Sequence, residues 1–153
     1  MMQKSIQLFL ITLLFVSCNK VNTIKKSVDN SSKKINIQGT WKLVYGEVKE
    51  NDSVKVKDLS KAEFIKIINE SHFAFFNQPY KNQEGFYGGG GSYSLEEDNY
   101  KETLNYVSVD AVRGHVFPFT VKIVGDTLIQ YGLEEVKEAG IHRDIVEKYI
   151  RVK

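Results

Sequence analysis

Residues 116–132 read VFPFTVKIVGDTLIQYG, two runs rich in Val, Ile and Phe on either side of Gly125-Asp126. Short runs of this composition are typical of half-buried β-strands, and a Gly-Asp pair between them suits a tight hairpin turn. The stretch therefore predicts two antiparallel strands joined by a hairpin.

The same pattern extends in both directions from this hairpin. About eight short strands separated by turn signals predict an all-β fold, a small antiparallel barrel or sandwich. Residues 51–57 are consistent with either a loop or an extra edge strand, and residues 133–142 contain helix formers that would allow a helical turn. The expected strands cover residues 39–48, 61–69, 72–77, 91–95, 100–109, 116–124, 127–132 and 145–152.

A single folded domain is expected over residues 37–153. It holds the only Trp, all 8 Tyr and most of the 9 Phe residues of the chain, which is ample surface for a core. Barrels of about eight strands are filled by side chains or hold one small molecule. So many aromatic rings predict a narrow interior.

The start of the chain has the features of an export signal. Residues 1–17 place Lys4 before an apolar run over residues 6–16. That run is shorter than the roughly 20 apolar residues of a membrane-spanning helix. Residues 14–18, LFVSC, resemble a bacterial lipobox. The resemblance implies a diacylglycerol anchor on Cys18, with cleavage before it, and hence a lipid membrane as a partner.

Two further observations bear on the anchor. Cys18 is the only cysteine, so the chain cannot form an internal disulfide. No acidic residue directly follows it, and we therefore expect the outer membrane, facing the periplasm. A disordered basic tether is predicted for residues 18–36, which hold five lysines against Asp29 and no aromatic residue. Its lysines either approach anionic lipid headgroups or simply keep a spacer soluble.

Nucleic acid is not an expected partner. The chain has 21 basic and 19 acidic residues, but the surplus of basic charge lies in the first 36 residues. The predicted domain carries 15 basic and 18 acidic residues, so it lacks the basic balance of a nucleic-acid-binding face.

Gly39-Thr40-Trp41 opens the first expected strand and resembles the Gly-x-Trp motif that begins lipocalin barrels. In that family an Arg of the last strand lies across the Trp, a position that Arg151 would take here. Three later stretches also look like bacterial lipocalin-like lipoproteins. They are EFIKIINESHFAFFN at 63–77, GGGGSYSL at 88–95 and GDTLIQYG at 125–132. The resemblance implies a barrel with Trp41 and Arg151 in structural roles.

Candidate ligand contacts follow from strand alternation. Glu102 shares a face with Tyr100 and Tyr106, and a buried carboxylate there would need a partner such as Lys66, Arg113 or a Tyr hydroxyl. Pockets combine aromatic walls with a few polar groups. The candidate ligand-binding residues are therefore Tyr45, Tyr93, Glu102 and Tyr106.

The remaining motifs do not indicate a phosphate-binding, metal or catalytic site. Residues 88–91 are four glycines without the Lys and helix of a phosphate loop, and a bend or bulge explains them better. The three histidines lack metal-ligand spacing, and no Gly-x-Ser-x-Gly nucleophile motif occurs. We expect no cofactor, no metal and no enzymatic activity.

The sequence therefore predicts an envelope lipoprotein whose lipocalin-like barrel binds a small apolar or amphipathic molecule. An alternative from another class is a filled barrel that serves as a structural or interaction module. Such a module would bind a protein or glycan through its loops.

Overall fold

The protein is described here from a computed structural model that covers residues 35–81 and 85–153. The predicted signal peptide, Cys18 and most of the predicted tether lie outside the described residues. Ile35, assigned to the tether from sequence, already packs against the hydrophobic core, so the folded domain includes it.

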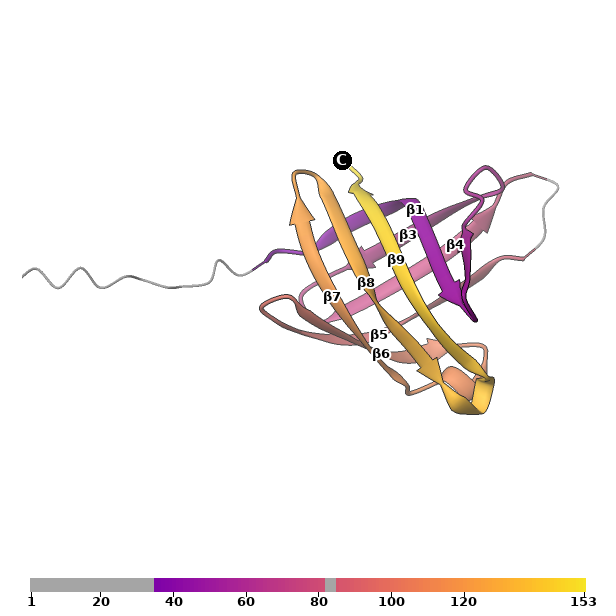
Figure 1. Ribbon diagram of the computed structural model, residues 1–153. Coiled ribbons are helices and arrows are strands. Elements are labelled where there is room, and N and C mark those ends of the chain that lie inside the picture. Colours follow the sequence, from indigo (N-terminus) through magenta and orange to yellow (C-terminus); the bar gives the residue numbers. More distant parts are fainter. Residues whose placement is uncertain (1–34, 82–84) are drawn as a thin grey trace, which may run out of the picture. The chain divides into compact units, whose positions relative to one another are not determined.

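Nine antiparallel strands form one sheet that closes on itself (Figure 1). From β3 to β9 each strand pairs with the next along the chain, and β1 pairs with both β3 and β9, which closes a barrel of eight strands, while β2 pairs with β1 alone. The strands are β1 (Gly39–Glu50), β2 (Ser53–Val56), β3 (Ala62–Ile68), β4 (His72–Pro79), β5 (Tyr87–Glu96), β6 (Asn99–Val107), β7 (Val116–Val124), β8 (Thr127–Val136) and β9 (Ile141–Arg151), with two short 3-10 helices, η1 (Asp110–Val112) and η2 (Lys137–Ala139).

The predicted all-β antiparallel barrel is confirmed, and the structure settles both ambiguous stretches. Residues 53–56 form the edge strand β2, which pairs with the far end of β1 across a two-residue turn. Both turn residues, Asn51 and Asp52, have positive φ, as a primed hairpin turn requires. Residues 133–142 extend β8, pass through the single turn η2 and begin β9. None of the helices in the described part of the chain has the length and apolar character needed to cross a bilayer.

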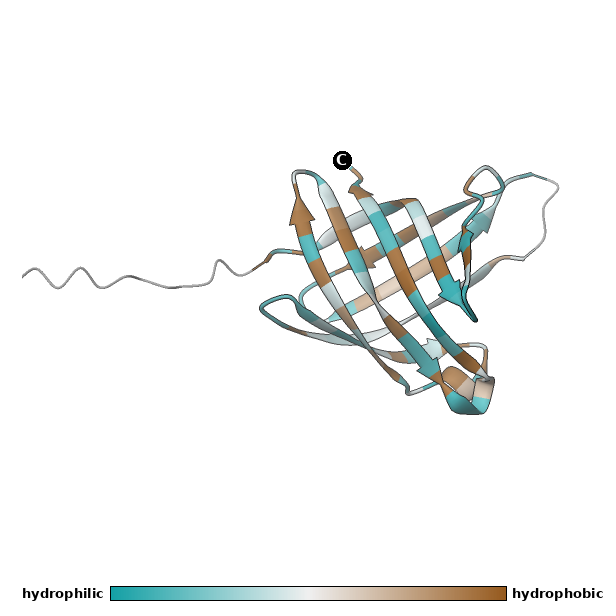
Figure 2. Ribbon diagram, in the orientation of Figure 1, coloured by the Kyte–Doolittle hydropathy of each residue, from teal (hydrophilic) through white to brown (hydrophobic). Residues whose placement is uncertain are grey.

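Alternation along the strands separates a core-facing side from a solvent-facing side (Figure 2). On β9, Ile145 and Tyr149 are buried whereas Lys148 and Ile150 are exposed. Two irregularities interrupt this period. β1 shifts register between Leu43 and Tyr45, and β6 has one extra residue opposite the step from Gly90 to Ser92.

The run of four glycines lies on β5, where the backbone of β6 approaches most closely. A Cβ on Gly91 would lie 1.8 Å from the carbonyl oxygen of Thr103, so no other residue fits. At this bulge the amide of Ser92 donates a hydrogen bond of 3.1 Å to the side-chain oxygen of Asn105. A bulge in this region was predicted from the glycines.

One end of the barrel is closed by Trp41, which is fully buried. Its indole Nε1 donates a hydrogen bond of 2.8 Å to the carbonyl of Ile37. The guanidinium of Arg151 lies over the ring, 4.1 Å from its centroid, and donates to the carbonyl of Gln38 at 2.6 Å. A Cβ on Gly39 would lie 2.2 Å from Arg151 Nη1, which explains the glycine of the Gly-x-Trp sequence. The contact expected between Trp41 and Arg151 is therefore present.

The opposite end of the barrel carries η1 and η2, which lie beside each other (Figure 1). His115, just after η1, approaches Glu138 of η2 at 3.5 Å. Trp41 and Arg151 are far from this end. The interior between the two ends contains the candidate site.

Candidate functional site

A cavity of about 880 Å³ occupies the barrel interior and opens at the end that carries η1 and η2. This corrects the narrow interior predicted from the aromatic residues. Several of the rings point outward and do not fill the barrel, because Tyr80, Phe86, Tyr106 and Tyr131 are exposed. We call this space the barrel cavity. Its apolar wall includes Phe64, Phe75, Leu104, Phe117, Phe119 and Ile145.

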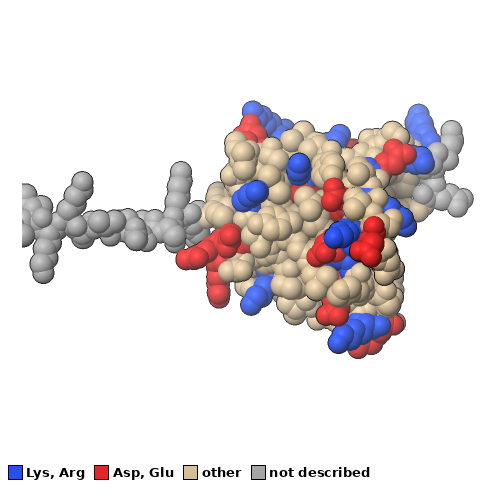
Figure 3. Space-filling model, in the orientation of Figure 1, with Lys and Arg blue, Asp and Glu red and all other residues tan. Residues whose placement is uncertain are grey.

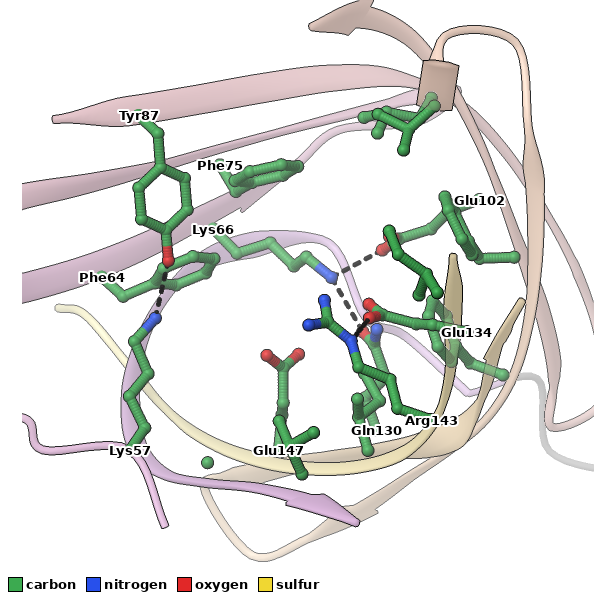
Figure 4. Close-up of a pocket in the computed structure, with 18 of the residues that line it drawn as sticks. Lys57, Phe64, Lys66, Phe75, Tyr87, Glu102, Gln130, Glu134, Arg143 and Glu147 are labelled. Atoms are coloured by element: carbon green, nitrogen blue, oxygen red, sulfur yellow. Dashed lines mark hydrogen bonds and ion pairs between the residues drawn. The ribbon is translucent and has the colours of Figure 1, made fainter. Parts of the chain in front are cut away.

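Three polar side chains form a cluster deep in the barrel cavity (Figure 4). Lys66 of β3 donates to Glu102 of β6 at 2.5 Å and to Gln130 of β8 at 2.8 Å. Only 2%, 6% and 1% of their surfaces are exposed. We call Lys66, Glu102 and Gln130 the inner polar cluster. It is electrically balanced, because one ammonium faces one carboxylate and an amide oxygen accepts a second bond.

Aromatic rings surround the Lys66 ammonium as well. Its Nζ lies 5.6 Å from the ring centroids of both Phe73 and Tyr149, and 5.8 Å from that of Tyr100. Burial raises the pKa of the Tyr100 and Tyr149 phenols well above the usual value, and nearby Glu102 acts in the same direction. Both phenols therefore stay neutral, and their rings add cation–π attraction to the ion pair.

Strand β9 supplies a second set of polar side chains nearer the open end (Figure 4). Arg143 Nε donates to Glu134 of β8 at 2.6 Å. Burial raises the pKa of Glu134, and the adjacent guanidinium of Arg143 partly opposes that rise. Glu147 also lines the cavity and accepts a hydrogen bond of 2.5 Å from the Tyr149 hydroxyl.

Lys57 lies at the open end of the cavity, in the segment between β2 and β3. Its ammonium donates to the Tyr87 hydroxyl at 2.9 Å and lies 4.4 Å above the centroid of the Phe64 ring. These contacts link the segment before β3 to the first residue of β5 beside the cavity entrance.

Of the four candidate ligand contacts predicted from sequence, the structure brings only Glu102 to the cavity. Its partner is Lys66, one of the three partners that the sequence allowed. Tyr93 points inward but lies toward the closed end, where its hydroxyl donates to the Asn69 carbonyl and its ring packs on Tyr100.

The inward positions expected for Tyr45 and Tyr106 are wrong, and both errors have one cause. Tyr45 follows the β1 irregularity and pairs with Lys148, an outward residue that lies over its ring. Tyr106 follows the β6 bulge and is 67% exposed. A bulge inserts one residue and moves every later side chain to the opposite face.

Sequence reasoning missed the polar residues Lys57, Gln130, Glu134, Arg143 and Glu147. A signal for two of them was available on β9. Counting back in steps of two from Arg151, which the sequence placed against Trp41, puts Glu147 and Arg143 on the inner face. Lys57 lies outside the strands, so no alternation could have assigned it.

The chain matches no protein-family model, and no curated protein matches it. The geometry of the site is therefore what indicates its chemistry. Within residues 35–81 and 85–153, no group of three His, Cys, Asp or Glu side chains is arranged to hold a metal ion. What the cavity offers is an apolar wall with charged groups at fixed places, an arrangement suited to orienting a bound molecule.

Arg143→Gln should lower the free energy of unfolding by about 1 kcal/mol at pH 8 and by less at pH 4. Glu134 has a raised pKa in the folded state, and loss of Arg143 raises it further. A carboxyl whose pKa is higher in the folded state than in the unfolded state stabilises the fold while it is protonated. That contribution to stability is lost as the pH rises through the folded-state pKa. Urea unfolding at both pH values measures the difference.

The matched control is Arg113→Gln, which removes an exposed pair with Asp110 on η1. We expect it to change stability little at either pH. An Arg143→Gln loss that is the same at pH 4 and pH 8 would show that the Glu134 carboxyl is not what Arg143 stabilises.

Proposed function

We propose that this protein is a lipid-anchored, lipocalin-like binding protein of the bacterial envelope, and that its role is to hold a small amphipathic molecule rather than to catalyse a reaction. The observation that carries the proposal is the barrel cavity. Its volume of about 880 Å³ lies within the roughly 300–1,000 Å³ of small-molecule sites. Apolar rings and a few fixed polar groups line it together, which favours a molecule with both kinds of surface.

The distribution of charge on the outer surface favours a binding site inside the barrel. On the face shown in Figure 3, Lys and Arg side chains are interspersed with Asp and Glu and do not gather in one basic patch. Such a mixed surface gives no electrostatic footprint for nucleic acid on this face. The alternative function, an interaction module, assumed a filled barrel, and the cavity supports binding in the interior over that alternative.

A probe titration tests binding in the cavity. We expect the neutral fluorophore N-phenyl-1-naphthylamine to bind the purified chain and to gain fluorescence. Val107→Trp, which fills part of the cavity wall, should weaken that binding at least tenfold. Val116→Trp is the matched control, because Val116 lies nearby on β7 but is 54% exposed.

The second arm of this test is mass spectrometry of small molecules extracted from the purified protein. A co-purifying amphipathic molecule that is lost in Val107→Trp and kept in Val116→Trp would support the proposal. Equal probe binding by both variants and no co-purifying molecule would contradict it, and the interaction module would then replace it.

The anchor is a separate prediction that concerns Cys18. Cys18→Ala should abolish incorporation of a labelled fatty acid and move the protein from the membrane fraction to the soluble fraction, because the variant lacks the sulfur that would carry the lipid. Cys18→Ser, which nearly keeps the size of cysteine but also lacks the sulfur, should give the same result. If either variant stays in the membrane fraction to the same extent as the unmodified sequence, the lipid anchor at Cys18 is wrong.

A further inference from the structure

The charged groups of the barrel cavity fall into two sets, those with a partner of opposite charge and those without. Lys66 is balanced by Glu102, and Arg143 is balanced by Glu134. Five charged lining residues have no ion-pair partner in the described part of the chain: Glu47, Glu50 and Lys55 belong to β1 and β2, whereas Glu147 on β9 and Lys57 before β3 face the same space as the two pairs (Figure 4). Glu147 and Lys57 carry opposite charges, so this part of the cavity presents an anion and a cation that have no ion-pair partner among the described residues.

Glu147 is held in place but not compensated. Its carboxylate accepts a hydrogen bond from Tyr149, whose side chain is fully buried and therefore fixed. Among the described residues, no Lys, Arg or His nitrogen lies within 4.0 Å of it. Figure 4 shows the carboxylate pointing into the open space of the cavity. A carboxylate fixed in this way is a ready partner for an ammonium group.

Lys57 provides the complementary charge, and Arg143 offers further hydrogen-bond donors to the cavity. The Lys57 ammonium contacts a phenol hydroxyl and two aromatic rings, but no carboxylate of the described residues lies within salt-bridge distance. Arg143 uses Nε for Glu134, while its two Nη atoms face the cavity (Figure 4). Guanidinium and ammonium groups both bind carboxylates and phosphates, and a planar guanidinium binds them with two parallel bonds.

We propose that the molecule held in the barrel cavity is a zwitterionic amphiphile, with an ammonium group at Glu147 and an acidic group at Lys57. This inference rests on the proposed function. A purely anionic molecule would bury Glu147 without a partner, and a purely cationic one would do the same to Lys57. One molecule with both charges neutralises both groups, and its apolar part lies against Phe64, Phe75 and Phe117.

A matched series of ten-carbon ligands tests this chemistry. We would titrate 2-aminodecanoic acid, decanoic acid, decylamine and 1-decanol into the full chain carrying Cys18→Ala, which needs no detergent. Displacement of N-phenyl-1-naphthylamine gives each Kd. The zwitterion should bind about tenfold more tightly than either singly charged ligand, as expected for one added charged hydrogen bond. Decyl phosphoethanolamine distinguishes a phosphate-containing head from an amino-acid head.

Two variants assign the charges. Glu147→Gln keeps an acceptor for Tyr149 and should remove the tenfold advantage of the zwitterion over decanoic acid. Lys57→Gln should reduce its advantage over decylamine. The controls are Glu63→Gln and Lys42→Gln, which change an exposed ion pair on the outside of the barrel and should leave all Kd values unchanged.

The outcomes separate this inference from the function on which it rests. If neither the fluorophore nor any ligand binds, the proposed function fails. If all four ten-carbon ligands bind equally, or if decanoic acid binds most tightly and Glu147→Gln does not improve it, the zwitterion is wrong and a less selective amphiphile site remains.

Discussion

Lys66→Met should lower the free energy of unfolding by about 3–5 kcal/mol. Lys66 is 2% exposed, and its ammonium is the only cation within salt-bridge distance of Glu102 among the described residues. Methionine matches the length and apolar stem of lysine, so the loss comes from the charge. It leaves a carboxylate buried in the barrel without compensation, and that costs far more than the net gain from an intact pair.

Urea unfolding of three variants separates charge from packing. Lys66→Met combined with Glu102→Leu removes both charges and should recover most of the stability, because a buried ion pair is worth little more than well-packed apolar groups. Lys42→Met breaks the exposed pair with Glu63 and should cost less than about 1 kcal/mol. A loss below about 1 kcal/mol for Lys66→Met would mean that water reaches and solvates Glu102 in the folded barrel.

Trp41→Ala should cost a similar amount, about 3–5 kcal/mol, for a different reason. The whole indole is buried, so its removal leaves a cavity at the closed end of the barrel. The carbonyl of Ile37 loses its hydrogen-bond donor, and Arg151 loses the ring beneath its guanidinium. Denaturant unfolding measures the total, and Val44→Ala on the exposed face of β1 is the control.

A double-mutant cycle with Arg151→Met isolates the contact between the two side chains. Its coupling energy should be about 0.5–2 kcal/mol, the range of cation–π pairs. Independent effects of Trp41→Ala and Arg151→Met would contradict a stacked pair. A loss for Trp41→Ala no larger than that of Val44→Ala would contradict the buried position of the indole.

Much of the barrel could be predicted from local sequence pattern. The turn at Gly125-Asp126 and the apolar runs on either side became β7, β8 and their hairpin. The closed end was predictable because Trp41 and Arg151 combine a recognisable motif with a cation on the last strand. The hairpin follows from the alternation of apolar residues, and the closed end follows from a short motif. A single sequence shows both without any knowledge of which strands pair.

The cavity could not be predicted to the same extent, since its inner face depends on two irregularities. Tyr45 and Tyr106 obey the period of their strands only up to the bulge that precedes each of them. The bulge on β6 depends on a close approach between Gly91 and Thr103, two residues that only the pairing of β5 with β6 brings together. Strand period is a local property, whereas register across neighbouring strands is not.

The pairing of Trp41 with Arg151 also sets when this barrel can close. The two residues are separated by roughly 110 positions, and β1 has no partner on its β9 side until the last strand exists. At about 5–20 residues per second, a ribosome would need on the order of 5 to 20 s to make the intervening chain. During that time the free edge of β1 and the edge of whichever strand was made last are sites for aberrant strand pairing. A chain that is exported as proposed must also stay unclosed until it has crossed the membrane, and we expect a holdase chaperone to bind it until then.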